Sequence, residues 1–370
     1  MNNRSEEHLR EELKESILSL CSVMSVSGYE NRSAENLKKV LAPYFDEHRT
    51  DAVGNHLFVR RCGKEGAPRV LIDAHFDEVG MLVSEICEGG FLRIVPVGGL
   101  SPTVLQGADV LIYGKKTLRG VITSTPPHLR TGGGDKETLP PCEELLVDTG
   151  YAKESLEALV SLGAPVGFAP CYGTLLREQI MGKSFDNKAC AAAALYAVIH
   201  TPREALAADV TVCLSCYEET SRLGGVAPAI FSEDPDYAMV IDVNLATVPD
   251  VPKRETVPLG EGISLSVSAA TDRRLTRMTE LLCRDHEIPH CTVAAPSSTG
   301  TNAMTVQLVG RGVPVVDVGL PLKSMHTYNE VISLVDAEAL CRLVTEFICS
   351  EKIADAFGGT DVVIKEGFPL

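Results

Sequence analysis

The chain has 370 residues, which is enough for two domains with large hydrophobic cores. It carries 34 Lys and Arg against 50 Asp and Glu, and the resulting formal charge of −16 argues against nucleic acid and anionic membrane partners. Trp is absent and aromatic residues make up only 5%, which disfavours a sugar-stacking groove. The composition predicts a folded protein with an acidic surface.

The cysteines and the N-terminus bear on where the protein works. Only Cys213 and Cys216 are spaced as C-x-x-C, and they lie in an apolar run without a second pair nearby. We interpret them as buried strand thiols rather than a zinc or redox site. Residues 1–20 read as an amphipathic helix with charges where a signal peptide needs an apolar core, and no stretch has the length of a membrane span. Many unpaired thiols suit a reducing compartment, so we expect a cytoplasmic protein.

The first part of the chain alternates helix and strand patterns. Ser27 and Glu30 have the spacing of a capping box, which predicts a second helix through residues 31–45. Residues 56–61 and 69–75 follow as strands, and the second is almost continuously apolar and therefore expected near the centre of a sheet. This alternation predicts an α/β fold with a mostly parallel sheet flanked by helices.

From residue 83 to residue 169 the pattern changes to short β-like pieces separated by turn residues. We expect residues 83–169 to form a small β-barrel inserted into an α/β domain made of residues 1–82 and 170–370. The Gly-rich stretch at residues 130–137 does not have the lysine and strand–helix context of a phosphate-binding loop, and we interpret it as a flexible tip.

The α/β rhythm then resumes to the end of the chain. Helices are predicted at the Ala-rich stretch ending at residue 200 and at residues 222–231, 273–286, 301–312 and 335–352, and strands at residues 210–216, 237–243, 262–269 and 313–320.

Side chains of metal-binding types follow several of the predicted strands. They are His75 and Asp77, Glu218 and Glu219, Asp242, and His326, with Asp186 just before the Ala-rich helix. Taken singly, each has an ordinary structural explanation, such as a helix N-cap for Asp186. Because sites in open α/β sheets form outside the carboxyl ends of the strands, we expect these side chains to converge.

The combination of residue types points to a particular chemistry. Two His and three carboxylates suit a pair of borderline divalent ions such as zinc, cobalt or manganese. In such a site one carboxylate bridges the ions, and a further carboxylate takes the proton of the activated water. The adjacent Glu218 and Glu219 can divide these tasks, with one binding metal and the other acting as general base.

At these residues the sequence resembles the M42 family of metallo-aminopeptidases, some members of which are labelled endoglucanases. The resemblance covers nearly the whole chain through "SVSGYE", "AHFDEVG", "GVITSTPPHL", "GKSFDNKA", "CYEE", "IDVN" and "VPVVDVGLPLKSMHTYNE". It implies an aminopeptidase that acts on short peptides. It also implies that the inserted β segment is a dimerisation domain and that dimers assemble into a dodecamer.

The resemblance further implies a role for each candidate residue. The metal ligands would be His75 with Asp242 on one ion and Glu219 with His326 on the other, bridged by Asp186. Glu218 would be the general base, and Asp77 would orient His75, as metal-bound histidines usually require.

The sequence departs from the family pattern beside these residues. "EETSRLGGV" is one residue longer than the usual "EEVGLRGA", Asn302 stands where an aspartate is common, and "DNK" and "KSMHT" replace "DDR" and "RYIHS". Because substrate pockets lie there, the departures bear on specificity, and Asn302, Arg222 and Lys323 are candidate substrate contacts. With Lys183 and Lys188, the basic residues either favour acidic substrate side chains or are ordinary surface residues.

Two alternatives stay open. A two-metal amidohydrolase or deacylase acting on small acylated amino acids would use the same ligands. A non-catalytic homologue would keep the fold, and the altered loops motivate that reading, whereas the intact ligands and base argue against it. A glucanase is disfavoured, because glycosidases use a carboxyl pair without two metals.

Overall fold

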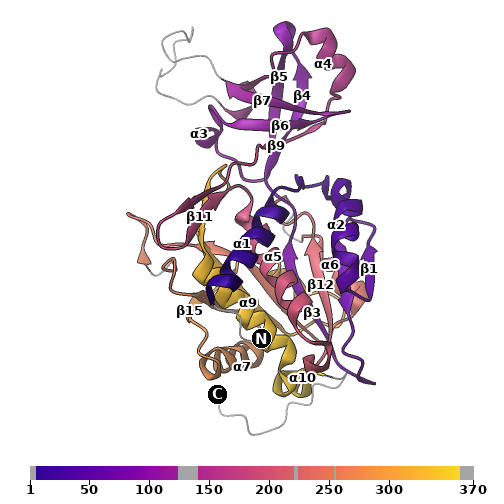
Figure 1. Ribbon diagram of the computed structural model, residues 1–370, viewed down its shortest axis with the longest axis vertical. Coiled ribbons are helices and arrows are strands. Elements are labelled where there is room, and N and C mark those ends of the chain that lie inside the picture. Colours follow the sequence, from indigo (N-terminus) through magenta and orange to yellow (C-terminus); the bar gives the residue numbers. More distant parts are fainter. Residues whose placement is uncertain (1–5, 124–140, 221–223, 254–255, 359–370) are drawn as a thin grey trace.

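The computed structural model describes residues 6–123, 141–220, 224–253 and 256–358. It consists of an α/β part and a barrel that projects from it (Figure 1). The Gly-rich stretch at 130–137 and the candidate residue Arg222 lie outside the described residues. Within the described ranges, no helix combines the length and apolar character that crossing a membrane requires.

An eight-stranded mixed sheet forms the centre of the α/β part. In spatial order its strands are β1 (Glu47–Thr50), β2 (His56–Arg60), β12 (Asp209–Ser215), β3 (Arg69–His75), β13 (Tyr237–Leu245), β16 (Val315–Leu322), β14 (Ile263–Ser268) and β15 (His290–Ala295). The four strands β12, β3, β13 and β16 run parallel, whereas β2 and β14 run antiparallel to their neighbours in this group. The predicted α/β fold is confirmed, and β3 lies inside the sheet, as its apolar run indicated.

Helices cover both faces of this sheet (Figure 1). The long helices α1, α5 and α9 pack over one face and the short α6 and α8 over the other, and successive residues of β3 alternate between them, with Ile72 in one core and Leu71 in the other. The helices of this part are α1 (Glu6–Cys21), α2 (Ala34–Leu41), α5 (Phe185–His200), α6 (Val226–Glu233), α7 (Arg273–Asp285), α8 (Ala303–Val306), α9 (Leu334–Cys349) and α10 (Glu351–Phe357). Helix α5 is buried almost all round between the sheet, α1 and α9, and its small alanines allow that close packing.

A closed barrel of six strands forms the second part. Its strands, in order around the barrel, are β4 (Gly80–Ile86), β5 (Phe91–Val97), β8 (Leu146–Asp148), β7 (Thr117–Thr123), β6 (Asp109–Tyr113) and β9 (Pro165–Phe168), and the short helices α3 (Pro102–Leu105) and α4 (Lys153–Leu159) accompany them. All pairs are antiparallel, and the side chains inside form a hydrophobic core separate from that of the α/β part. The predicted barrel is therefore present.

A small antiparallel sheet lies beside the carboxyl end of the main sheet. It consists of β10 (Gly173–Leu175), β11 (Gln179–Gly182) and β17 (Glu330–Ser333). Strand β11 leads into the start of α5, and β17 leads into α9, so this sheet fixes the ends of two long helices.

The predicted capping box does not form. The hydroxyl of Ser27 is 2.9 Å from that of Thr220, and the carboxylate of Glu30 accepts the N–H of Tyr217 at 3.4 Å. Both side chains thus interact with residues of the loop after β12 and do not cap the start of a helix. The region that was expected to be one helix is a 3₁₀ turn (Glu30–Ser33), α2, and a second 3₁₀ turn (Ala42–Tyr44).

Candidate metal centre

The carboxyl end of β3 brings His75 to the centre of the site. Strand β12 runs parallel to β3 with Ser215 in register with His75, and the next strand along, β13, carries Asp242. The Nε2 atom of His75 is 3.1 Å from Oδ1 of Asp186, at the start of α5, and 3.6 Å from Oδ1 of Asp242. These three side chains are almost fully buried.

The second histidine comes from the loop after β16. Nε2 of His326 is 3.2 Å from Oε2 of Glu219 and 3.4 Å from Oδ2 of Asp186. The two carboxylate oxygens of Asp186 therefore face different histidines.

Two groups of potential ligand atoms result, and Asp186 belongs to both. In each group, one atom per residue lies within 4.8 Å of the others, and the members are His75, Asp186 and Asp242 in one group and Asp186, Glu219 and His326 in the other. The structure brings together all five side chains that the sequence singled out as ligands.

Glu218 lies beside the first group without being part of it. Its Oε2 atom is 3.9 Å from Nε2 of His75, and its side chain is 19% exposed, compared with 5% for Glu219. Neighbours in sequence, the two glutamates thus have different surroundings.

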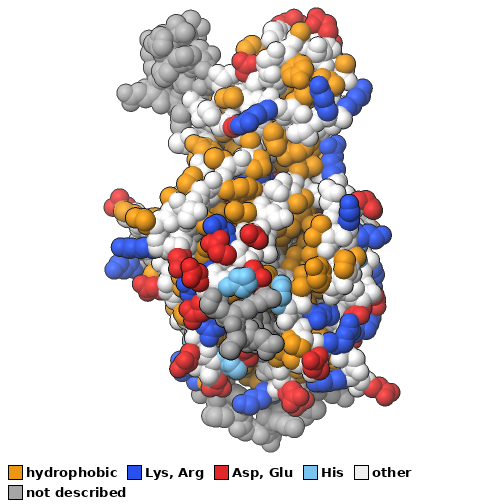
Figure 2. Space-filling view, in the orientation of Figure 1, with side chains coloured by type: hydrophobic (Ala, Val, Ile, Leu, Met, Phe, Trp, Pro, Cys, Tyr) orange, Lys and Arg blue, Asp and Glu red, His pale blue; other side chains and the backbone are white. Residues whose placement is uncertain are grey.

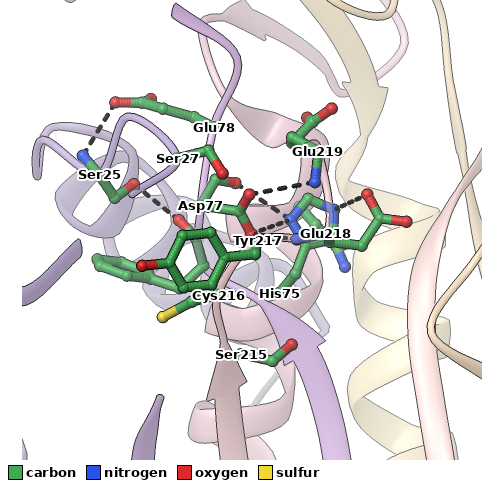
Figure 3. A network of polar contacts seen from close by, with 12 residues as sticks. Ser25, Ser27, His75, Asp77, Glu78, Ser215, Cys216, Tyr217, Glu218 and Glu219 are labelled. Atoms are coloured by element: carbon green, nitrogen blue, oxygen red, sulfur yellow. Dashed lines mark hydrogen bonds and ion pairs between the residues drawn. The ribbon is translucent and has the colours of Figure 1, made fainter. Parts of the chain in front are cut away.

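Asp77 holds the backbone of this glutamate pair. One of its carboxylate oxygens accepts the N–H of Glu218 and the other accepts the N–H of Glu219, each at 3.1 Å (Figure 3). Nδ1 of His75 also lies 3.1 Å from the backbone oxygen of Asp77 and 3.5 Å from its carboxylate. Asp77 therefore contacts the imidazole of His75 and also fixes the glutamate pair, and this second contact was not predicted.

The clustered carboxylates of the centre favour positive charge on the two histidines. Burial lowers the pKa of His75, but the Asp242 carboxylate and the hydrogen bond to Asp186 outweigh it and raise the pKa well above its ordinary value. Burial likewise opposes protonation of His326, yet its bonds to Asp186 and Glu219 raise its pKa. Without metal, the imidazoles therefore take up protons to balance the surrounding carboxylates.

The donor set fits divalent cations. It combines imidazole nitrogens with carboxylate oxygens, which suits zinc, cobalt and manganese. Moreover, the buried Oε1 atom of Glu219 has no hydrogen-bond partner within the part of the chain that the structure describes. Such an orphaned carboxylate oxygen is expected where an ion completes the site.

Comparisons with known proteins identify the family of the chain. The family model described as M42 glutamyl aminopeptidase matches residues 54–343. The chain belongs to this family. The lysyl aminopeptidase of Pyrococcus furiosus is 30% identical over 86% of this chain and 91% of its own length.

Solved structures of an aminopeptidase and of a TET peptidase share the fold. An aminopeptidase from the archaeon Desulfurococcus kamchatkensis superposes with a TM-score of 0.86 at 26% identity, covering 96% of this chain and 100% of that chain. The TET1 peptidase of Pyrococcus horikoshii has a TM-score of 0.79 at 26% identity, covering 91% and 99%. The chain is thus an M42 hydrolase of the aminopeptidase type.

Glu330, which sequence reasoning missed, contacts two of the candidate ligand residues of this site. The carboxylate of Glu330 accepts the backbone N–H of Asp186 at 3.1 Å and that of His326 at 2.9 Å. The signal in the sequence is the position of Glu330 four residues after His326, in the motif "HTYNE".

A second missed residue, Asn55, holds the loop that carries the glutamate pair. Its Oδ1 accepts the N–H of Cys216 at 2.9 Å, and its Nδ2 donates to the carbonyl of Gly225 at 2.6 Å. These two residues flank the loop, and the N–H of Gly225 also donates to the carbonyl of Cys216. The loop is therefore closed at its base.

Both interpretations offered for Lys183 and Lys188 are wrong. These lysines are buried, and their ammonium groups contact the carboxylate of Glu78 at 2.5 and 3.0 Å. Burial raises the pKa of Glu78, but the two lysines outweigh it and lower the pKa to about 2. The cluster is an internal ion-pair network and neither a surface feature nor a substrate contact.

Two of the predicted substrate contacts can be placed. The Nδ2 group of Asn302 is buried and donates one hydrogen to Asp73 at 2.9 Å and the other to Ser215 at 3.0 Å. This nitrogen therefore has no hydrogen left to donate to a substrate. Lys323 is half-buried, and its backbone pairs with Val331. Substrate binding by either side chain stays a prediction.

Proposed function

We propose that this M42 enzyme is a two-metal aminopeptidase that removes N-terminal residues from short peptides. The observation that carries the proposal is the arrangement around Asp186, whose two oxygens face two separate histidine-containing groups, with Glu218 adjacent but in neither group. One ion would be held by His75, Asp186 and Asp242, and the other by the second group.

The ions and the protein would divide the chemistry. When bound, two divalent ions lower the pKa of a water molecule and polarise the carbonyl of the scissile peptide bond. Zinc and cobalt are the ions we favour, and manganese suits the same ligands. Glu218 would take the proton of the attacking water and deliver it to the leaving amine, a task for a carboxylate that is close to the ligands and not consumed by them.

Asp77 would serve this reaction through position. Because it accepts the N–H groups of both Glu218 and Glu219, it fixes the base relative to a ligand. Its contacts with Nδ1 of His75 leave Nε2 directed at Asp186 and Asp242.

The molecular surface that Figure 2 shows suits a peptide substrate. Figure 2 shows acidic and histidine side chains near one another on the α/β part, below a band of hydrophobic side chains that reaches towards the barrel. An acidic surrounding favours the positively charged amino terminus of a peptide.

We also propose how the enzyme is organised. The expected division at residues 83 and 169 would separate the catalytic domain from a barrel used for dimerisation. The separate barrel core supports two domains, although this core includes Met81 and strand β4 begins at Gly80, three residues before the expected boundary. The TET1 relative assembles into a tetrahedron or an octahedral shell, and we extend homo-oligomer formation, from dimer to dodecamer, to this chain. The twelve free thiols suit the cytoplasm.

Mass spectrometry of a peptide mixture tests the proposed function. The metal-loaded protein is incubated with free and N-acetylated versions of each peptide. Stepwise loss of N-terminal residues from the free peptides alone is the expected result, and the preferred residues would give the specificity. Cleavage of blocked substrates would instead favour the amidohydrolase, and no cleavage with zinc, cobalt or manganese would favour a non-catalytic homologue.

A further inference from the structure

We infer that Glu330 is a positioning residue that sets the spacing between the two halves of the metal centre. This inference rests on the proposed function, because it assumes that Asp186 and His326 are metal ligands. Its evidence is a pair of hydrogen bonds from the backbones of these two residues to one buried carboxylate.

The two bonds join segments that are far apart in the chain. Oε2 of Glu330 accepts from the N–H of Asp186, at the start of α5, whereas Oε1 accepts from the N–H of His326, in the loop after β16. Asp186 is common to both groups of ligand atoms, and His326 belongs to one. A single carboxylate therefore ties the bridging position to a ligand of one ion.

The backbone of Glu330 is itself fixed from two sides. In β17 it pairs with Gly182 of β11, which leads directly towards Asp186. The next residue, Val331, exchanges two backbone hydrogen bonds with Lys323, just before the loop that carries His326. Glu330 thus lies on the strand between the two segments whose separation it would control.

The His326 loop needs such a support. His326 has a φ of 60° and Ser324 a φ of 58°, a left-handed conformation that is unfavourable for residues other than glycine. The bond from the N–H of His326 to Glu330 holds this conformation in place. The imidazole also has a contact on its other side, where Nδ1 is 3.0 Å from the carbonyl oxygen of Gly99.

Glu330 would act through its neighbours and not as a ligand. Each of its oxygens already accepts a backbone hydrogen bond, and it belongs to neither group of potential ligand atoms. A glutamine at this position has one oxygen to accept with, and its NH₂ group would face the other N–H. Glu330→Gln therefore breaks one of the two bonds without changing the size of the side chain.

The chain offers a matched control in Asp336. This carboxylate is also fully buried and also accepts two backbone N–H groups, from Gly260 and Gly262, both at 2.7 Å. Neither glycine belongs to the metal centre. Asp336→Asn thus removes an equivalent bond whose donor is not a candidate ligand.

The experiment titrates three metal-free proteins with cobalt: the parent, Glu330→Gln and Asp336→Asn. Binding is measured by calorimetry and by the visible absorption of bound Co²⁺. In Glu330→Gln, the affinity for one ion should fall about 10- to 100-fold and the absorption should change, while Asp336→Asn should match the parent. Parental affinity in Glu330→Gln, or an equal loss of affinity in both variants, would overturn the inference.

If Glu330→Gln does not fold, Glu330→Asp replaces it, since the shorter side chain cannot span both N–H groups. Parental affinity in that variant would count against the inference in the same way.

The same titration separates this inference from the proposed function. A parent that binds two ions but cleaves no peptide would overturn the proposed function, and the affinity comparison would still decide the role of Glu330. A parent that binds no cobalt would overturn both.

Discussion

Glu218 and Glu219 have the same side chain but differ in what surrounds it. Glu219 contacts His326 at 3.2 Å within a group of ligand atoms, whereas Glu218 approaches His75 only to 3.9 Å and remains partly exposed. We expect Glu218→Gln to lower kcat by about 10²- to 10⁴-fold, because it removes the proton acceptor while keeping the shape of the side chain. Metal content should stay at the parental level.

Kinetics with the preferred peptide and elemental analysis of the same preparation check this prediction. Glu219→Gln is the matched comparison and should lose metal as well as turnover. A Glu218→Gln enzyme with near-parental kcat would remove Glu218 from the mechanism.

The family departure at Asn302 has a local explanation in Asp73. The amide donates to the Asp73 carboxylate at 2.9 Å, and burial raises the pKa of Asp73 to about 6. An aspartate at position 302 would place two carboxylates against each other in a buried site, so we expect Asn302→Asp to lower the free energy of unfolding by about 1–3 kcal/mol.

Exchanging the two residues tests this explanation. The double variant Asp73→Asn with Asn302→Asp restores one amide and one carboxylate, and it should recover most of the stability lost in the Asn302→Asp variant. Denaturant unfolding of the metal-free proteins measures both effects. A single variant as stable as the parent would show that the amide is not needed opposite Asp73.

The candidate metal ligands could be picked out from the sequence because most of them follow the ends of apolar strands. The residues that position them could not. Asn55 and Glu330 act through backbone N–H groups of distant segments, and such bonds leave no periodic pattern. The buried lysines were misread for a related reason, since Glu78, their partner, lies more than a hundred residues away in sequence.

At the scale of elements, buried strands were predictable and marginal elements were not. The apolar runs correspond to β3, β12, β13 and β16, which lie side by side within the main sheet. Strand β15 was missed because it lies at the sheet edge and is largely not buried, which weakens its apolar pattern. The helix expected over residues 301–312 is only the short α8.

The loop after β12 is held by side chains along its first four residues. The N–H groups of residues 216–219 donate in turn to Asn55, Glu30, and both oxygens of Asp77. We expect Asn55→Ala to lower kcat beyond its effect on stability, since it frees the base of the loop that carries Glu218. The lost buried hydrogen bonds should cost about 1–3 kcal/mol.

Asp272→Ala is the control for this variant. It removes the N-cap of α7, where the carboxylate accepts the N–H of Leu275 at 2.7 Å, and should cost about 1 kcal/mol. Steady-state kinetics and thermal unfolding of both variants are compared. Equal kcat in the two variants would show that Asn55 stabilises the fold without positioning the loop.

At the scale of the whole molecule, the barrel and the metal centre are not independent. The barrel has its own hydrophobic core, yet Gly99, just after barrel strand β5, contacts the imidazole of His326. A change at the barrel therefore has a direct structural route to His326, one of the candidate metal ligands.

The stability of the molecule should also depend on pH through His56, at the start of β2. The imidazole ring is fully buried. Its centroid is 5.9 Å from the ring centroid of Phe76 and 6.1 Å from that of His48. Burial, and then the charge of His48, lower the pKa of His56 from 6.5 to about 4. Between these values the unfolded chain binds the proton and the folded chain does not, so acidification destabilises the fold.

Comparison with His56→Phe isolates the titration of His56 together with its interaction with His48, because the titrating groups away from this pair contribute equally to both proteins. The substitution keeps an aromatic ring beside Phe76 and removes the titrating group. From pH 7 to pH 5, the parent should lose about 2 kcal/mol of unfolding free energy relative to the variant. Urea unfolding of the metal-free proteins at both pH values measures the difference. A difference that does not change with pH would mean that His56 binds its proton equally well in the folded and unfolded chains.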